Sequence, residues 1–544
     1  MVASLSMSGD ATTLPLHENL AGTARAGRRG RLGGHAGTLA GTGLRVRAAA
    51  LSLALIVVLS AMIVLLAADR PSLLSATTHF GFFPRWMAGP LGGLWSGAPR
   101  GVNTLKFLFT GAVVLMYGGY LLIVANARAL PLRWVAAAIV AAHVIFLLSP
   151  PLALTDVFNY INYGRMEIVH HLNPYTTIPI LEPHNDPAYL LSNWHQLLSP
   201  YGPLFTLLTF AVVPLGVAAS FWVLKLLLAL TSLATIFLVW RCAKLLGRDQ
   251  TTAVALVGLN PIVLVWGLGG DHNDFLIVFC IVLGFYLLLS MQARGAAAGV
   301  AQASEPRKEE AGAAVAAPAS PPAPAPARGG AWLLPLSATA IGAGAAFVMA
   351  TGLKASGGVL IPVVLAGLLR APRALLQVVL GMLVVAAVVG GASLLAFGLH
   401  IPDLGTQSRV VTNESVPNLI GLALGKGGQS ESLHKLMSGV LALAIVVCCV
   451  QAWRWRDALT ACGWASMALL ITLGWVLPWY VLWALPFAAL SRSRRLRVAV
   501  LVFGAYMILA WSPASGLLWS QIGFHPERTP LGRLHQRYVK ELLN

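Results

Sequence analysis

The sequence predicts an all-α protein that crosses a membrane many times. Of its 544 residues, 57% are hydrophobic and only 10% are charged, and the mean hydropathy is +0.75. A soluble domain carries about a quarter charged residues, so a chain this apolar cannot cover itself with polar surface in water. Apolar runs close to the length that spans a bilayer as a helix, about 20 residues, recur along most of the chain.

Each long apolar run is expected to form one transmembrane helix. In chain order the runs are Ala48–Ala68, Leu105–Val124, Val135–Leu152, Phe221–Trp240, Ala253–Leu268, Phe275–Ser290, Leu333–Thr351, Leu375–Phe397, Leu436–Trp453, Leu459–Leu477 and Val498–Trp511. The shorter runs Gly358–Leu369 and Tyr480–Leu490 are expected to span with help from neighbouring helices. Together they predict about thirteen transmembrane helices. The stretch Leu204–Val217 fits this order only as a helix at the membrane interface.

The net charge of +18 comes largely from short basic segments between apolar runs. Examples are Arg45 with Arg47, Arg241 with Lys244 and Arg248, and Arg492 with Arg494, Arg495 and Arg497. Lys and Arg in short loops mark the cytoplasmic side of a membrane protein, so the basic N-terminus is expected inside. The same pattern argues against nucleic acid as a partner. Counting helices from the N-terminus places the polar, aromatic loop 153–203 outside the cytoplasm.

The order of apolar, polar and Ala/Pro-rich stretches divides the chain into five parts. They are a basic cytoplasmic tail (1–47), a transmembrane module that contains the extracytoplasmic loop (48–291), a linker (292–330), a second transmembrane module (331–513) and a basic C-terminal tail (514–544). The linker buries nothing and is expected to be disordered and cytoplasmic. The C-terminal tail falls outside the cytoplasm if the helix count is about thirteen, which fits poorly with its basic residues.

Several kinds of chemistry are not indicated by the sequence. The five cysteines lie in or beside apolar runs without metal-ligand spacing, and they are Cys242, Cys280, Cys448, Cys449 and Cys462. The chain has no GxxxxGK[ST] phosphate loop, so an ATP-driven pump is not expected unless another subunit supplies the motor. Neither a metal nor a cofactor is expected.

The densest polar motif is TDVFNYINYGRMEIVHHLNPY, Thr155–Tyr175. Asp156 lies just beyond the outer end of a predicted helix, where a carboxylate can reach a substrate whose lipid tail stays in the bilayer. The same residue could simply cap an interfacial helix. Tyr160 and Tyr175 have an equally plain interpretation as interfacial aromatic residues, and Asn173 before a proline indicates a turn.

Two further motifs stand at predicted outer ends of helices. SPYGPLF, Ser199–Phe205, contains Tyr201 and is consistent with a rigid turn. GGDHNDFL, Gly269–Leu276, lies in a short outer connection. His272 and Asp274 there resemble a pair of metal ligands, but a metal site needs a third ligand. Hydrogen bonding to a substrate, or an ordinary loop role, explains them better.

Cations and aromatic rings complete the set of candidate residues. Lys354 follows a predicted helix at its outer edge, and Lys225 lies inside an apolar run near its outer end. Ionisable groups in such places are costly and tend to be functional, although a lysine can also snorkel to the interface. Pairing with a phosphate is the functional alternative. Trp479 and Tyr480, in LPWYVLWALP, belong to an aromatic belt or to one wall of a binding site.

In their order along the chain, these motifs resemble a known family. TDVFNYINYGR…LNPY, PYGPLF, NPIVLVWGLGGDHNDFL, LKASGGVLIP and VLPWYVLWALP look like the actinobacterial polyprenol-phosphate-mannose-dependent α-1,6-mannosyltransferases of the glycosyltransferase C superfamily. The resemblance covers roughly Thr155 to Pro486 and implies the GT-C fold. It also implies that Asp156 is the catalytic base. Similar proteins often have His-Asn-Glu where this chain has His272, Asn273 and Asp274, which leaves the role of Asp274 open.

The resemblance implies a plasma-membrane glycosyltransferase that works on the extracytoplasmic face. It would move mannose, with inversion, from polyprenyl-phosphate-mannose to a hydroxyl of a glycolipid or lipoglycan acceptor and form α-1,6-mannan-type linkages. The donor phosphate would be met by Lys354, then Lys225 or Arg409. Residues expected to hold the sugar or the acceptor are Asn159, Tyr160, Asn173, Tyr175, Tyr201, His272, Asn273, Asp274, Trp479 and Tyr480.

The alternative function is a transporter or flippase for a lipid-linked sugar. Such a protein would be expected to carry broken helices and polar groups at mid-membrane depth. The polar motifs here gather at the outer face instead, which favours the enzyme. The sequence does not identify the acceptor, the linkage, the oligomeric state or whether the protein starts or extends a glycan.

Overall fold

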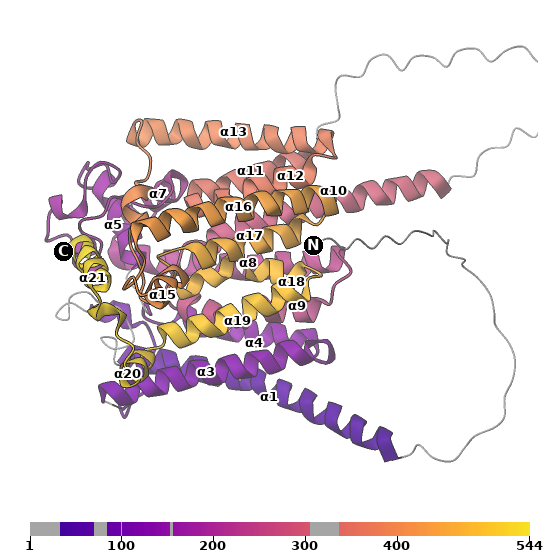
Figure 1. The fold of residues 1–544 in the computed structure, drawn as a ribbon, viewed down its shortest axis with the longest axis horizontal. Helices are drawn as coiled ribbons and strands as arrows, with labels where there is room; N and C mark the ends of the chain where they lie inside the picture. Colours follow the sequence, from indigo (N-terminus) through magenta and orange to yellow (C-terminus); the bar gives the residue numbers. More distant parts are fainter. Residues whose placement is uncertain (1–32, 70–83, 100, 153–155, 305–336, 544) are drawn as a thin grey trace, which may run out of the picture. The chain divides into compact units, whose positions relative to one another are not determined.

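The fold is described by a computed structural model that covers residues 33–69, 84–99, 101–152, 156–304 and 337–543 (Figure 1). Every regular element in these ranges is a helix, as the sequence predicts. The chain divides into a short N-terminal unit, Met1–Arg45, of which the start of α1 is described, and a large unit, Val46–Asn544, which holds the remaining elements.

Within the described ranges, six helices are long and apolar enough to cross a membrane. They are α1 (Gly33–Asp69), α3 (Val102–Asn126), α8 (Val217–Leu245), α10 (Asp274–Ser304), α13 (Pro372–Phe397) and α16 (Glu431–Trp455). Two bent pairs raise the number to as many as eight, namely α9 (Gln250–Gly258) with η5 (Ile262–Leu268) and α19 (Arg494–Trp511) with α20 (Ser515–Gln521). The protein is therefore a multi-pass membrane protein.

The other predicted spans are formed by helices shorter than the usual span. They are α4 (Leu132–Leu147), α11 (Ala338–Leu353), η6 (Ala355–Leu360) with α12 (Ile361–Leu368), α17 (Ala458–Thr472), and η7 (Pro478–Trp483) with α18 (Leu485–Leu490). By length and composition the described residues thus supply six to eight spans, fewer than the predicted count of about thirteen, which counts every apolar run.

Prolines explain two places where a predicted helix is interrupted. The run Ala253–Leu268 bends by 43° between α9 and η5, at Asn260 and Pro261. Pro261 lacks a backbone N–H, and the side-chain oxygen of Asn260 accepts a hydrogen bond from Ile262 N at 2.9 Å. Pro478 and Pro486 similarly split the region around Tyr480–Leu490 into a 3₁₀ helix and a short α-helix.

The predicted linker begins later than the sequence indicates. Helix α10 continues to Ser304, so residues 292–304 are helical rather than disordered. The reason is local composition, because the segment GAAAGVAQAS is rich in alanine, the residue with the highest helix propensity. The remainder of the predicted linker, 305–330, lies outside the described residues.

The polar loop after α4 folds into several short elements. They are α5 (Asp156–Ile168), η3 (Pro179–Leu181), α6 (Pro187–Leu191), α7 (Pro203–Phe210) and η4 (Val213–Leu215). At about 1.5 Å per residue, α7 is far too short to span, as predicted for the stretch Leu204–Val217.

The C-terminal tail is helical and lies against the polar loop. After η8 (Pro526–Arg528), helix α21 (Pro530–Leu543) places Leu542 against Leu197 and Val410. Gln196 N donates to Leu542 O at 3.0 Å. In the same region are α14 (Leu404–Ser408) and α15 (Val416–Ala423), and Tyr538 donates to the carbonyl of Thr406. The tail and the loop therefore occupy one end of the helices (Figure 1).

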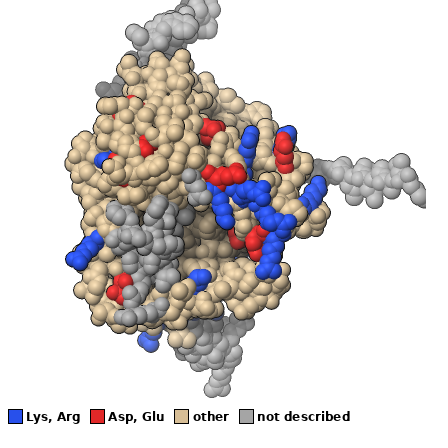
Figure 2. All heavy atoms as spheres, turned by 90° about the vertical axis from the view of Figure 1, so that its left-hand side faces the viewer, with Lys and Arg blue, Asp and Glu red and all other residues tan. Residues whose placement is uncertain are grey.

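This end carries both acidic and basic side chains. Figure 2 shows the largest group of them on one side of this face, with a few others scattered over the rest. Helix α21 exposes Arg533, Arg537 and Lys540 at helical spacing, and Arg409 is exposed at the end of α14. The end named here, with α5, α7 and α21, is called the loop end below. The opposite end, which carries Arg248, Arg370, Arg456 and Arg492, is called the arginine end.

Close helix packing supports the loop end from within the large unit. Helix α10 packs on α8 and α11, and α11 packs on α13. At Gly344 and Gly381 the backbones of α11 and α13 approach so closely that a Cβ atom on either residue would collide with a carbonyl of the other helix. Such small-residue contacts are common between membrane helices, and they fix the position of α11, which leads directly into Lys354.

Candidate active site

Asp156 is the first residue of α5 and lies against the turn between η5 and α10. Its Oδ2 is 3.3 Å from His272 Nδ1, and the Asp156 side chain keeps 14% of its surface exposed whereas His272 keeps 1%. The contact is close but lacks hydrogen-bond geometry, since neither ring nitrogen of His272 has a hydrogen-bond partner within the described chain. Asp156 is thus a partly accessible carboxylate beside a buried imidazole.

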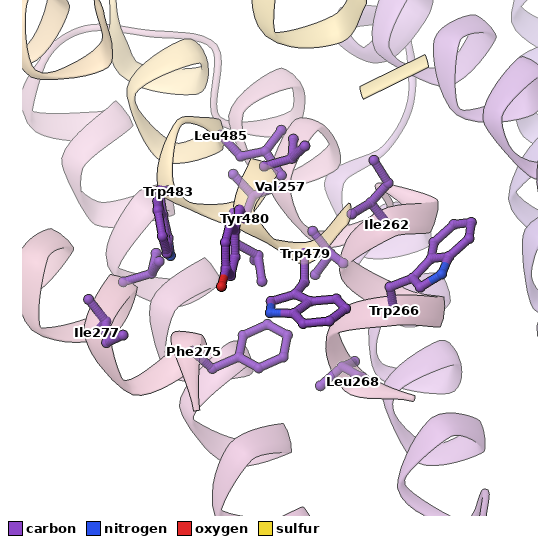
Figure 3. Packing of buried hydrophobic residues seen from close by; sticks show 14 of the residues in the cluster. Val257, Ile262, Trp266, Leu268, Phe275, Ile277, Trp479, Tyr480, Trp483 and Leu485 are labelled. Carbon is purple, nitrogen blue, oxygen red and sulfur yellow. The ribbon is translucent and has the colours of Figure 1, made fainter. Parts of the chain in front are cut away.

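His272 is held by stacking. Its ring lies flat on Trp479 of η7, with centroids 3.5 Å apart and planes 10° apart. Asp271, just before it, has a left-handed backbone with φ of 56°, a conformation that a short polar residue tolerates better than most. Figure 3 shows the packing nearby, where Trp479 lies beside Phe275 and the η5 residues Ile262, Trp266 and Leu268 lie on one side of η7. The turn 269–274 is therefore anchored by aromatic residues.

Asp274, two residues after His272, holds Lys354. Lys354 Nζ donates to Oδ1 at 3.2 Å and Oδ2 at 3.3 Å, and the indole N–H of Trp483 donates to Oδ1 at 2.8 Å. The ammonium group also lies over the ring of Tyr480, 4.8 Å from its centroid. Burial alone would lower the pKa of Lys354, but Asp274, Tyr480 and Asp156 together outweigh it and raise the pKa. Lys354 is therefore a fixed cation.

Lys225 forms a second ion pair, which is closed. Its Nζ donates to Asp271 Oδ1 at 2.7 Å, and both side chains are 1% exposed. Burial raises the pKa of Asp271 to about 6, although Lys225 opposes the effect. In this arrangement Lys225 neither snorkels to the interface nor faces an open space. It ties α8 to the turn that carries His272.

Two residues of α5 order the polar loop around Asp156. The hydroxyl of Tyr160 accepts a hydrogen bond from Asn273 N at 3.3 Å, and its ring meets Tyr201 edge-on with centroids 4.8 Å apart. The side-chain amide of Asn159 exchanges two hydrogen bonds with Asn193, at 2.8 and 3.0 Å. Tyr160, Asn159 and Asn273 are all buried, so they position the loop rather than face solvent.

The LNPY and PYGPLF motifs connect the loop to the second module. Asn173 donates to the carbonyl of Phe397 at 2.8 Å, and Tyr175 donates to the carbonyl of Tyr201 at 2.9 Å. Gly202 N donates to Leu353 O at 3.0 Å, and a Cβ atom on Gly202 would collide with the carbonyl of Gly352. This glycine is required for the close approach that places the loop beside Lys354.

A cavity of about 290 Å³ opens beside Lys354. Its polar lining includes Gln407, Ser408, His434 and Ser438, its apolar lining includes Met437, Leu441 and Leu469, and the rings of Trp475, Tyr480 and Trp483 complete it. A cationic group at one side and aliphatic walls at the other suit an amphiphilic anion. The cavity is named the lysine cavity below.

The predicted site residues fall into three groups. The turn and η7 bring together Asp156, His272, Asp274, Lys354 and Tyr480, with Trp479 beneath. The surrounding loops are fixed by half-buried Asn173 and by the buried residues Asn159, Tyr160, Tyr175, Tyr201 and Asn273. Arg409 follows Gln407 and Ser408 but does not itself line the lysine cavity, and Lys225 is sealed by Asp271.

Sequence reasoning missed Trp483, His434 and Ser438. Trp483 lies in the quoted LPWYVLWALP motif but was not distinguished from its neighbours. His434 and Ser438 are four residues apart on one face of the first turns of α16, and that spacing is the signal that could have identified them. Among the described residues, no three His, Cys, Asp or Glu side chains gather as a metal site.

Fold and site together define a multi-pass, all-helical membrane protein whose candidate site lies at one end of its helices. Residues 71–371 match the family model described as alpha-(1→6)-mannopyranosyltransferase, N-terminal domain, and residues 414–525 match the one described as MptB C-terminal domain. The first match covers more than half of the chain, so the protein belongs to the alpha-(1→6)-mannopyranosyltransferase family, as the resemblance of the motifs predicted.

Relatives in two bacteria agree with this family. An alpha-(1→6)-mannopyranosyltransferase A of Mycobacterium tuberculosis is 28% identical over 68% of this chain and 67% of its own length. A second alpha-(1→6)-mannopyranosyltransferase of that species is 27% identical over 65% of each chain. One from Corynebacterium glutamicum is 29% identical over 33% of this chain and 36% of its own. The matched part is thus about two thirds of a relative's length or less. No solved structure matches the chain.

Proposed function

We propose that this protein transfers mannose from polyprenyl-phosphate-mannose to a hydroxyl of a glycolipid or lipoglycan, forming α-1,6-mannan-type linkages. One observation carries the proposal. A single turn places His272 against the accessible carboxylate Asp156 and, two residues later, Asp274 against the fixed cation Lys354. A base for an attacking hydroxyl and a cation for a leaving phosphate are thus set side by side.

The lysine cavity supports a donor carried on a lipid. Its polar side offers Lys354, His434 and Ser438 to a phosphate, and its apolar side offers Met437, Leu441 and Leu469 to the first part of a polyprenyl chain. The nearby helix α16 leaves most of its apolar side chains uncovered by protein, so a chain leaving the cavity can continue into the bilayer. A donor that is held by its phosphate and its lipid chain needs no nucleotide for binding.

In the proposed reaction, Asp156 takes the proton from the acceptor hydroxyl as that oxygen attacks the anomeric carbon. The bond between this carbon and the phosphate oxygen breaks from the opposite face, so the configuration inverts. The polyprenyl phosphate leaves as an anion and needs no proton donor. One carboxylate therefore suffices, whereas most glycosidases use two. Lys354 stabilises the negative charge that develops on the phosphate.

The shorter carboxylate at position 274 fits this scheme. Asp274 is almost fully buried, and its carboxylate accepts hydrogen bonds from Lys354 and Trp483. Its role is to position the cation, and the reacting groups do not need to touch it. His272 similarly positions Asp156 through the close contact between Nδ1 and Oδ2.

We further infer the GT-C fold with about thirteen membrane crossings and a plasma-membrane location, with the loop end outside the cytoplasm. The contacts of α21 with the polar loop put the C-terminal tail at the loop end as well. An odd number of crossings then leaves the basic N-terminus inside, in agreement with the expected charge distribution.

The test is transfer of radiolabelled mannose from polyprenyl-phosphate-mannose to membrane glycolipids. At equal expression, Asp156→Asn is expected to lose about 10²- to 10⁴-fold of the rate while remaining folded. Glu431→Gln, which removes an exposed carboxylate at the same end, serves as the control and should transfer at the wild-type rate. Equal rates for Asp156→Asn and wild type would remove Asp156 from the mechanism. Absence of transfer by wild type would overturn the donor assignment.

A further inference from the structure

A second, larger cavity lies at the arginine end, across the helix bundle from the lysine cavity. Its volume is about 570 Å³. It is formed where α8, α12, α16 and α18 end and α17 begins, beside the middle of α10. The lysine cavity is formed by the opposite ends of α16 and α17 together with η6 and η7. The two cavities are therefore separated by the length of the helices, and a ligand of one cannot occupy the other.

Four arginines from four separate segments line this cavity. They are Arg248, Arg370, Arg456 and Arg492, and the lining includes one carboxylate, Asp457. That carboxylate is already engaged, because it accepts hydrogen bonds from Thr460 N at 3.0 Å and Thr460 Oγ1 at 2.6 Å. The lining thus carries an excess of three positive charges.

The four arginines differ in burial, because Arg370, Arg456 and Arg492 are exposed whereas Arg248 is half-buried. In the described part of the chain, none of them forms a salt bridge or a side-chain hydrogen bond, and Nε of Arg248 is buried without a partner. Arg370 instead lies over the Trp453 ring, 5.3 Å from its centroid. Burial and the charge of Arg492 lower the pKa of Arg248. Mutually repelling cations in one cavity are relieved by a bound anion.

Apart from Gln292 and Ser491, the remaining lining is mostly apolar. It includes Phe285, Leu288 and Leu289 of α10, Val364 and Leu368 of α12, and Leu490. Exposed arginines on the cytoplasmic side of a membrane protein are ordinary and usually face solvent. Here arginines from distant segments converge above an aliphatic wall. A free phosphate would contact only the arginines, whereas a lipid would contact both the arginines and the apolar residues.

From this juxtaposition we propose that the arginine-end cavity binds the phosphate group of an anionic membrane lipid, with the upper part of an acyl chain on α10 and α12. Basic pockets between membrane helices suit such head groups, and a guanidinium group can bind a phosphate with two parallel hydrogen bonds. The site is separate from the proposed mannose transfer, and it stands whether or not that transfer is found.

The test is native mass spectrometry of the full-length protein in a non-ionic detergent. Dioleoyl phosphatidylglycerol, dioleoyl phosphatidylcholine or inorganic phosphate is added at the same concentration. Phosphatidylglycerol is expected to form a one-to-one adduct at roughly tenfold lower concentration than phosphatidylcholine, and inorganic phosphate is expected to form none. The double variant Arg248→Gln/Arg492→Gln should bind phosphatidylglycerol roughly 30-fold more weakly.

Two further variants separate this site from general effects. Arg494→Gln/Arg495→Gln removes two exposed charges at the start of α19, outside the cavity, and should bind like wild type. Arg248→Lys/Arg492→Lys keeps the charge and should retain part of the binding, which a misfolded protein would not. Equal loss in the Arg494/Arg495 variant, equal adducts with both lipids, or full binding by the glutamine variant would overturn the proposal. Equal binding of inorganic phosphate would overturn the lipid as its source.

Discussion

The loop end and the arginine end of the helices treat charge in opposite ways. At the loop end each buried lysine has its own carboxylate, Lys354 with Asp274 and Lys225 with Asp271. At the arginine end four arginines share a cavity with one carboxylate that caps a helix. The first arrangement pairs each lysine without a ligand and leaves the side chains of Asp156 and Lys354 each 14% exposed. The second is incomplete, and it is the one that calls for a bound anion.

This difference explains how a site for a phosphate can be built on an ion pair. An unpaired buried lysine would be costly, since charge is expensive to bury without a partner. Asp274 removes that cost before the substrate arrives, and the phosphate needs only to share Lys354. Under the two proposals, the loop end is expected to bind and release a phosphate, and the arginine end is expected to hold a lipid phosphate.

The largest effect is expected on the rate of mannose transfer when Lys354, the cation of the loop end, is removed. Lys354→Gln is expected to lower mannose transfer by roughly 100-fold, because the leaving phosphate loses its electrostatic stabilisation. The measurement is the rate of transfer at saturating donor. Lys435→Gln, which removes an exposed lysine on α16, is the matched control and should transfer normally. An unchanged rate in Lys354→Gln would show that the phosphate is met elsewhere.

The second ion pair should behave as a structural element. Lys225→Met leaves Asp271 buried without a partner and is expected to destabilise the fold by about 3–5 kcal/mol. Replacing both partners, as Lys225→Met/Asp271→Leu, should restore much of that loss, because neither charge is then left alone. The measurement is the thermal unfolding midpoint of the detergent-purified protein. If the double variant were no more stable than the single one, the ion pair would not explain the effect.

A smaller effect concerns pH and the buried Glu182 of the polar loop. Its carboxyl accepts from Asn162 Nδ2 at 2.5 Å, and burial raises the pKa of Glu182 from 4.5 to about 8. A carboxyl with a raised folded-state pKa binds its proton more tightly when folded, so its contribution to stability is lost as pH rises from about 4.5 to about 8.

Glu182→Gln keeps a side chain of similar shape that does not titrate. Between pH 5 and pH 8.5 the thermal unfolding midpoint of this variant should fall less than that of wild type. The two proteins should differ least at pH 5, where folded Glu182 is protonated and the pH is closest to its unfolded pKa of 4.5. Parallel curves over the whole range would mean that Glu182 ionises freely in the fold.

Much of the site followed from the sequence because polar residues at helix ends are rare in so apolar a chain. Asp156, His272, Asp274 and Lys354 were all identifiable in this way, and the structure brings them together. The closure of Lys225 by Asp271 was not predictable, because it depends on which face of α8 meets the turn. The stack of His272 on Trp479 joins segments about 200 residues apart, a pairing that spacing along the chain does not reveal.

The fold was predictable in class but less so in its details. Apolar length identifies a helix, yet it does not show where Asn260 and Pro261 bend one, or that α10 runs on to Ser304. Those outcomes depend on prolines and on alanine content beyond the apolar core. The place of α21 followed from tertiary contacts with Leu197 and Val410, which no local pattern contains.

The hydrogen bond between Trp483 and Asp274 crosses from the part of the chain that matches the C-terminal family model to the part that matches the N-terminal one. Neither matched part contains all the residues of the candidate active site. If one matched part were exchanged between two distant members of the family, the residue at position 274 would contact an indole that had evolved in a different protein. Across the family, positions 274, 354 and 483 are therefore expected to have evolved as one inherited unit.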